Sequence, residues 1–230
     1  MIAAVYEAMS TQRIIVILSG MLGMLLLMLI RRNSFPQIKI WKYPLISAYL
    51  TIAGVAGTLL LFFVESGHFG GTSFYGAVLF VPLLMIPVML LGISFKDLMD
   101  LCAPAECLML TIMKTDCIMS NCCIGKYLPS LGFQFPSQII EMITAFFVML
   151  ILLDMEAKAK YRGKLYAWYL ILYGTTRFAL NWFRYGIKPF VLGLPAGNFW
   201  SVIAVILGLV WLAMLRTGKT HSKRPSCGRE

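Results

Sequence analysis

Long runs of apolar residues recur along this chain, and they restrict its fold more than any other feature. The first run, Ile14 to Ile30, holds seventeen residues without a charge. At ~1.5 Å per helical residue, this run comes close to the ~30 Å thickness of a bilayer core. Of the 230 residues, 60% are hydrophobic and only 13% are charged, a balance that excludes a soluble globular protein. The sequence therefore predicts an all-α, polytopic membrane protein.

About seven such runs can be traced, and together they predict a single membrane domain over residues 1–230. Pro82 and Pro87 lie inside the third run and predict a kinked helix there. The fourth run is the weakest because it contains Asp100, Pro104 and Glu106, so it is either a short buried span or a re-entrant segment. The predicted spans are residues 14–30, 44–64, 73–93, 98–113, 137–153, 165–184 and 199–215, with a polar loop over 114–136 and a basic tail over 216–230.

The distribution of basic residues predicts how the chain crosses the membrane. With seven spans, 14 of the 20 lysines and arginines lie inside, because only six fall elsewhere: Arg13, Lys114, Lys126, Arg177, Arg184 and Lys188. This excess follows the positive-inside rule and places the N-terminus outside and the C-terminus in the cytoplasm. Anionic lipid, rather than nucleic acid, is the expected partner of the net charge of +10. We expect no cleavable signal, because residues 1–12 carry Glu7 and lack a basic cluster.

The six cysteines and two histidines do not form a recognisable metal motif. His68 and His221 are far apart, and the cysteines lack the spacing of a zinc finger. The sequence therefore predicts no metal site. Cys122 and Cys123 are adjacent in the polar loop, where pairing with Cys117 or burial explains them more simply than an acyl-carrying or redox site.

An arginine inside the sixth run points to a functional site. Arg177 would lie at membrane depth, where its charge costs roughly 2.5–3.5 kcal/mol on insertion scales, so it requires a partner. Polar residues of this run are four, four and three positions apart, which predicts one polar stripe on an otherwise apolar helix: Tyr173, Arg177, Asn181 and Arg184. Either the stripe lines a site, or its arginines reach lipid headgroups as interfacial anchors. Glu141 in the fifth run is a carboxylate that could pair with either arginine.

Three further segments face the predicted outer side. Gly70 to Gly76 is a glycine-punctuated entry into the third span, which close helix packing alone would explain. Lys114 to Lys126 is a turn-rich loop with two basic groups. Pro136 to Glu141 is typical of a helix start, since proline in the first turn needs no N–H partner.

Taken in order, these segments resemble the prolipoprotein diacylglyceryl transferase family, and especially its shorter, cysteine-rich members. The most specific matches are Pro136-Ser137-Gln138 with Glu141, and Tyr173-Gly174 followed by Arg177-Phe178 and Arg184. The resemblance implies a seven-helix enzyme of the bacterial cytoplasmic (inner) membrane. Such an enzyme transfers diacylglycerol from the phospholipid phosphatidylglycerol to a cysteine thiol of a lipoprotein precursor, releases glycerol phosphate, and needs no metal or cofactor.

The resemblance also assigns roles to individual residues. Catalytic roles fall on Arg177, Arg184, Glu141 and Tyr75, and substrate-binding roles on Tyr173, Asn181, Lys114, Gln138, Ser137 and Gly76. The arginines and the lysine would neutralise the phosphate as charge develops on the leaving oxygen. The base that takes the thiol proton would be Glu141, Tyr75 or His68.

Three departures from the family pattern bear on catalysis. Tyr75 stands where the family has a histidine, Lys114 begins a segment where the family has Arg-Ile-Gly, and Asn181 replaces a glutamate. Lysine keeps the charge but loses the two-pronged contact that arginine makes with phosphate. A lipid-binding homologue that has lost catalysis is therefore a second interpretation. A small-solute transporter is a third, which the absence of visible repeats disfavours.

Overall fold

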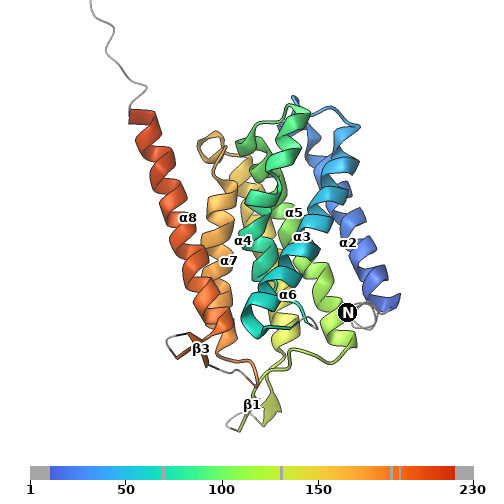
Figure 1. Ribbon diagram of the computed structural model, residues 1–230, viewed down its shortest axis with the longest axis vertical. Helices are drawn as coiled ribbons and strands as arrows, with labels where there is room; N and C mark the ends of the chain where they lie inside the picture. The colour runs from blue at the N-terminus through green and yellow to red at the C-terminus, as the bar shows by residue number, and fades with distance from the viewer. Residues whose placement is uncertain (1–10, 69–70, 130–131, 187–188, 192, 221–230) are drawn as a thin grey trace, which may run out of the picture.

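The computed structural model describes residues 11–68, 71–129, 132–186, 189–191 and 193–220, and these form a bundle of helices (Figure 1). Some features of the sequence lie outside the described residues: Gly70 of the glycine segment, Lys188, and the end of the tail with His221 and Cys227.

Seven α-helices fall within the described residues: α2 (Thr11–Ile30), α3 (Lys42–Ser66), α4 (Tyr75–Leu84), α5 (Phe95–Met119), α6 (Ser137–Glu156), α7 (Leu165–Asn181) and α8 (Ala196–Thr220). Four of them, α2, α3, α6 and α8, are long and apolar enough to cross a membrane. Large apolar side chains are exposed on these four helices, among them Leu22, Ile52, Phe147 and Leu209. Lipid solvates such surfaces better than water does. The fold is that of an all-α membrane protein.

The third predicted span is divided at its prolines. α4 is followed by a 3₁₀ helix, η2 (Ile86–Leu91), and Met85 lies between the two. Pro82 lies inside α4 and Pro87 at the beginning of η2. Each proline removes a backbone donor, so a regular ladder of helical hydrogen bonds cannot continue through both. The kink expected from the sequence is present.

α5 lies inside the bundle and differs most from the prediction. We expected a short apolar stretch followed by a polar loop from Lys114, but the helix continues without a break through 25 residues. It packs against α2, α6 and α7, and every residue from Leu98 to Cys107 is buried. Asp100 and Glu106 therefore lie within protein rather than lipid, where charged groups are tolerated.

A buried arginine joins several segments at one end of the bundle. Arg31, expected in a basic loop, lies in the 3₁₀ helix η1 (Arg31–Ser34) and is buried. Its Nε donates to Glu156 Oε2 at 2.6 Å, and its terminal nitrogens donate to the carbonyl oxygens of Leu101 and Asp100 at 2.9 Å each. These contacts tie η1 to α5 and α6. A further 3₁₀ turn, η3 (Ala159–Tyr161), connects α6 to α7 at this end.

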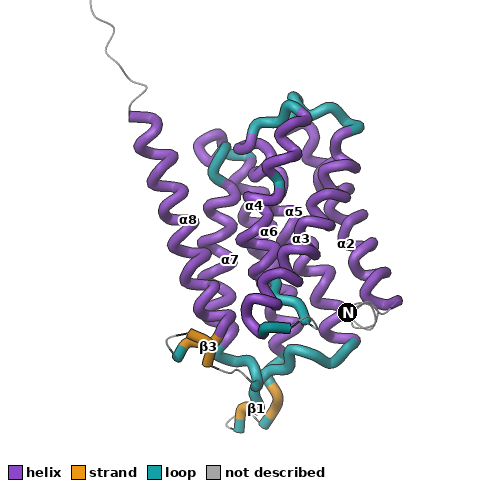
Figure 2. The backbone as a smooth tube through the Cα atoms, viewed as in Figure 1, coloured by secondary structure: helices purple, strands orange, loops and turns teal. Residues whose placement is uncertain are grey.

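Two short antiparallel hairpins lie at the opposite end. β1 (Tyr127–Leu128) pairs with β2 (Phe133–Gln134), and β3 (Pro189–Val191) pairs with β4 (Leu194–Pro195). Figure 2 shows the strands where α5 and α7 end and where α6 and α8 begin. Polar residues in the last turns of α5 and α7 are thereby brought near the first turns of α6 and α8.

Candidate functional site

A buried carboxylate with three positively charged neighbours lies at the hairpin end of the bundle. Glu141 is in the second turn of α6 and is only 4% exposed. Lys114 and Arg177 form ion pairs with its two oxygens, and Arg184 Nε lies 3.8 Å from Oε1. One negative charge therefore has three positive neighbours, which leaves a local surplus of positive charge. Such a surplus attracts anions.

Three different helices contribute Glu141 and the two cations that pair most closely with it. α6 begins directly after Pro136, as the sequence predicts, and this start places Glu141 one turn inside the helix. Lys114 belongs to α5, so the expectation of a loop there is wrong. Arg177 belongs to α7. The pairing of Glu141 with both arginines, which the sequence left open, is present.

Arg184 is held by backbone contacts and not by the helix predicted for it. α7 ends at Asn181, so the turn that carries Arg184 lies beyond the helix. That turn forms an antiparallel bridge with the loop after α5, in which Arg184 pairs with Gly125. The loop therefore places the Arg184 side chain beside the α6 carboxylate, and the predicted four-residue helical stripe is shorter than expected.

A small cleft is lined by Glu141 and by one of its three cationic neighbours, Arg177. The other lining residues are Leu110, Thr144, Ala145, Tyr173, Thr176 and Leu180. Guanidinium groups bind phosphate oxygens with charge-assisted hydrogen bonds, and apolar walls suit hydrocarbon. The cleft holds only about 10 Å³, so it places Arg177 where an anionic group can reach it and does not enclose a whole lipid.

Tyr75 and Tyr173 form an aromatic contact next to this cleft. Their ring centroids are 5.5 Å apart, and Phe74 also contacts Tyr173. Tyr75 is only 3% exposed, and its hydroxyl oxygen lies 2.5 Å from Ser201 Oγ on α8. The Ser201 hydroxyl is also 2.6 Å from the Gly197 carbonyl oxygen, to which it donates. The structure thus places Tyr75 in a buried contact between α4 and α8.

Asn181 faces α8 and does not pair with Arg177. It is 3% exposed, and its side-chain amide donates to Asn198 Oδ1. The Asn198 amide donates in turn to the Phe178 carbonyl oxygen at 3.3 Å. Sequence reasoning missed Asn198 and Ser201, although both are polar residues near the start of an otherwise apolar final span. The asparagine pair joins α7 to α8.

Ser137 and Gln138 hold the loop that follows α5. Ser137 Oγ donates to the Cys123 carbonyl oxygen at 2.5 Å, and Gln138 Nε2 donates to the Cys122 carbonyl oxygen at 2.7 Å. These bonds fix the loop against the first turn of α6. The structure therefore gives both residues a positioning contact in addition to any contact with substrate.

The contacts described for Gly76 and His68 are made with residues other than Glu141 and its three cations. Gly76 of α4 packs against Gly57 of α3 so closely that a Cβ at either position would overlap the backbone of the other helix. Close helix packing, the simpler explanation of this glycine, is thus observed. His68 is exposed and its Nδ1 lies 3.0 Å from the Ser66 carbonyl oxygen.

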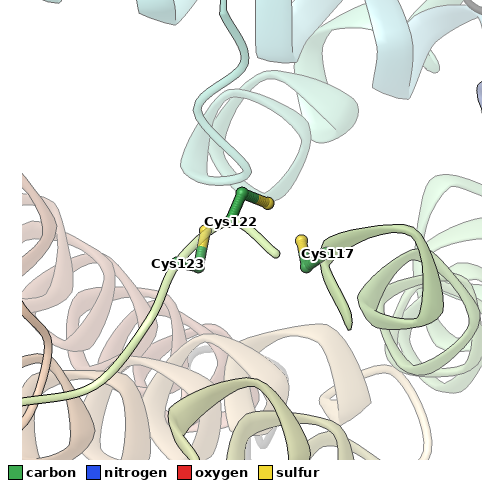
Figure 3. Close-up of side chains that lie close together, drawn as sticks. All are labelled: Cys117, Cys122 and Cys123. Atoms are coloured by element: carbon green, nitrogen blue, oxygen red, sulfur yellow. The ribbon is translucent and has the colours of Figure 1, made fainter. Parts of the chain in front are cut away.

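Three cysteines converge where α5 passes into the loop. The sulfur atoms of Cys117, Cys122 and Cys123 all lie within 4.8 Å of one another (Figure 3). A hydrogen bond from the Cys117 thiol lowers the pKa of Cys123 to about 5, and the positive charges of Arg184 and Lys114 act in the same direction. Thiolates bind metal ions and react as nucleophiles. Among the described residues, this is the cluster best suited to holding a metal.

Comparison with known proteins agrees with the resemblance noted in the sequence. The sequence model of the family described as prolipoprotein diacylglyceryl transferase matches residues 14–214. A Campylobacter lari protein named phosphatidylglycerol–prolipoprotein diacylglyceryl transferase is 38% identical over 90 residues, which cover 37% of this chain and 33% of that protein. A Clostridium tetani protein of the same name is 26% identical over 126 residues, covering 49% of this chain and 51% of its own length. The chain thus matches about a third to a half of the length of these relatives.

Proposed function

Because the chain belongs to the prolipoprotein diacylglyceryl transferase family, we propose that it is a membrane enzyme that transfers a diacylglyceryl group from phosphatidylglycerol to a cysteine thiol. The acceptor is a lipoprotein precursor peptide or a related thiol. The leaving group is glycerol phosphate. Both relatives carry the name of this reaction, and the charges of the site support it.

The observation that carries the proposal is the surplus of positive charge around Glu141. Arg177 and Lys114 form ion pairs with this carboxylate, and Arg184 Nε lies 3.8 Å from it. When the cleft widens to admit a phospholipid, the lipid's phosphate would meet Arg177, and its acyl chains would contact the apolar lining residues. Glu141 keeps the cations together before the lipid arrives, so the site is organised in advance.

The reaction is a displacement at a glycerol carbon. The acceptor thiolate forms a carbon–sulfur bond as the carbon–oxygen bond to the phosphate breaks, and the phosphate oxygen keeps the electron pair. Arg177 and Arg184 stabilise that developing charge, and a site shielded from water strengthens the stabilisation. Lys114 adds a third charge without the two-pronged geometry of arginine.

We propose for the membrane arrangement that all seven helices cross, with α4 and η2 acting as one span. Support comes from the four long apolar helices and from the way α5 and α7 pack among them. The N-terminus then lies outside, and the cleft opens toward the outer side of a bacterial cytoplasmic membrane. A topology reporter fused after Glu230 should report the cytoplasm, and one inserted at Gly67 should report the outside. The reverse result at either position would contradict this arrangement.

Transfer can be tested with the purified chain in vesicles that contain phosphatidylglycerol. A peptide carrying one acceptor cysteine should gain a diacylglyceryl group, with release of an equal amount of glycerol phosphate. A matched peptide with serine in place of that cysteine should remain unmodified. Absence of the modified peptide from vesicles that contain folded protein would exclude the transferase function.

A lipid-binding homologue without turnover is a second candidate, which one observation favours. The resemblance implies that Tyr75 stands where the family has a histidine, and its hydroxyl contacts Ser201 inside the bundle. The same vesicles distinguish the two candidates. Retention of phosphatidylglycerol without peptide modification would support the binding protein.

A further inference from the structure

We propose that Cys117, Cys122 and Cys123 bind a thiophilic metal ion such as Zn²⁺ and leave one coordination position open to the thiolate of the acceptor. The first half of this proposal concerns metal binding and stands without the transferase reaction. The second half rests on the proposed function, because it gives the metal the acceptor thiol as its fourth ligand. The inference departs from the sequence prediction of no metal site, which considered spacing alone.

The distances between the sulfur atoms suit a single metal ion. A tetrahedral zinc with Zn–S bonds of ~2.3 Å holds its sulfur ligands about 3.8 Å apart. The three sulfurs lie within 4.8 Å of one another, so shifts of about 1 Å or less would bring them to bonding positions. Figure 3 shows Cys117 at the end of α5 and the other two on the loop, with their sulfurs directed into one space.

The backbone holds the loop in an uncommon conformation that brings the thiols together. Asn121 and Cys123 have positive φ angles of 49° and 58°, a region that residues other than glycine rarely adopt. The Cys122 N–H donates to the Cys117 carbonyl oxygen at 3.0 Å and closes the turn. Together with the bonds from α6 to the Cys122 and Cys123 carbonyl oxygens, this turn fixes the cysteine backbone from both sides. A strained and well-fixed loop is typical of a functional position.

The number of ligands indicates an open site. A structural zinc site normally has four protein ligands, whereas a catalytic one has three and keeps a position for water or substrate. Within the described residues, the cluster contains three ligands of the His, Cys, Asp or Glu type. Soft thiolate ligands select Zn²⁺, Cu⁺ or iron–sulfur clusters over hard ions such as Mg²⁺.

The charges around the cluster favour an anionic metal centre next to the phosphate site. Three thiolates and Zn²⁺ carry a net charge of −1. Two cations lie close in the fold, since Lys114 is three residues before Cys117 on α5 and Arg184 pairs with Gly125, two residues after Cys123. These two residues also lie within 4 Å of Glu141, so the metal position adjoins the cationic cleft. A metal-bound thiol loses its proton outright. Metal binding thus activates the acceptor sulfur without a protein base. Of the candidate bases, Tyr75 is buried against Ser201, and the described bonds of His68 do not reach the cysteine cluster.

The reaction step is then balanced without a protein base. The acceptor thiol gives its proton to solvent as its sulfur binds the metal. That sulfur forms the bond to the glyceryl carbon, the carbon–oxygen bond to phosphate breaks, and the phosphate leaves with the electron pair toward Arg177. The thioether product is neutral and a weaker ligand than a thiolate, so it leaves the metal.

Metal binding can be measured on the full chain purified in detergent under reducing conditions. Titration with Zn²⁺ should give one tightly bound ion per chain, and Co²⁺ should give the intense sulfur-to-cobalt absorption of a thiolate site. The triple variant Cys117→Ser, Cys122→Ser and Cys123→Ser should lose both signals. Cys102→Ala, which removes a buried cysteine of α5 far along the helix, should keep them. Equal metal binding by the triple variant would overturn the proposal. A disulfide among the three cysteines, found in protein isolated without added oxidant, would also overturn it.

The open position is tested by adding the acceptor peptide to the Co²⁺ form. The cysteine peptide should change the absorption bands, whereas its serine analogue should not. Unchanged bands would overturn the assignment of the acceptor as fourth ligand. Full transfer by the metal-free protein or by the triple variant would overturn the catalytic part and leave the proposed function standing. Absence of transfer by the metal-loaded protein, with the cysteine peptide bound to the metal, would reject the proposed function together with the reaction step on the metal, and would leave metal binding standing.

Discussion

The two ends of the helical bundle each contain a buried arginine–glutamate pair, but the pairs differ in how their charges are balanced. Arg31 meets Glu156 and two carbonyl oxygens, so all three of its nitrogens have acceptors. Glu141 meets Arg177, Lys114 and Arg184, so three cations share one carboxylate. The first end has matched charges, whereas the second has a surplus of positive charge.

This difference separates a structural role from a binding role. Burial of a charge requires a partner, and a matched pair meets that requirement without capacity for a ligand. Unmatched cations beside a cleft remain able to bind an anion. The side chain of Arg184 is 23% exposed and that of Arg31 only 5%, and for this difference in arginine exposure alone we call the two ends open and closed.

The largest expected effect concerns the closed end. Arg31→Ala leaves Glu156 buried without its cation, and breaking a buried pair typically costs about 3–5 kcal/mol of unfolding free energy. Arg32→Ala, at the exposed neighbouring position, is the matched control and should change stability by less than about 0.5 kcal/mol. Chemical denaturation in detergent micelles measures both. Equal stability of the two variants would show that the closed end is not a structural network.

The next effect concerns the open end and should appear in lipid binding rather than stability. Arg177→Lys keeps the charge but loses the planar contact with phosphate. Loss of one charge-assisted hydrogen bond, worth about 1.5–3 kcal/mol, implies a 10- to 150-fold lower affinity for phosphatidylglycerol or rate of transfer. Arg184→Lys should have a smaller effect, because Arg184 is more exposed and more distant from Glu141.

Arg162→Lys, at an exposed arginine near the closed end, should leave binding and transfer unchanged. Binding to vesicles containing phosphatidylglycerol, measured beside a thermal unfolding curve, separates affinity from stability. A folded Arg177→Lys protein that binds and transfers lipid like the parent would show that Arg177 is an interfacial anchor.

The smallest expected effect decides whether Tyr75 has a structural or a catalytic role. Tyr75→Phe removes the hydrogen bond to Ser201 and should cost about 0.5–1.5 kcal/mol of stability. If the hydroxyl has only a structural role, the folded variant should transfer lipid at a rate within about twofold of that of the parent. A tenfold change would correspond to about 1.4 kcal/mol. A loss of transfer of 100-fold or more without a loss of lipid binding would instead make Tyr75 a catalytic residue.

The sequence predicted the helical membrane class because long apolar runs require helices in lipid. It also predicted the break in the third span, since prolines act locally through the backbone. For α5 it left open a short buried span, but it ended the segment too early, because hydropathy alone does not extend an apolar helix through polar residues such as Lys114. In the structure other helices enclose this residue.

Part of the candidate site could likewise be anticipated. The need of Arg177 for an anion is a local property, and Glu141 was a plausible partner for it. The burial of Arg31 was not predictable in this way, because its partner Glu156 is 125 positions away. Convergence of Cys117 with Cys122 and Cys123 depends on two positive φ angles, which spacing does not reveal.

The backbone bridge between Gly125 and Arg184 makes the loop after α5 sensitive to its length. Two hydrogen bonds hold the pairing, from the Lys126 N–H to Phe183 O at 2.8 Å and from the Tyr185 N–H to Ile124 O at 2.9 Å. Successive residues in extended pairing point to opposite faces, so a register change of one position reverses them. Inserting a single residue into this loop would change which residue pairs with Arg184 and so displace the guanidinium relative to Glu141, with every amino acid of the site retained. Loop length is therefore as much a determinant of the cationic cleft as the identity of its arginines.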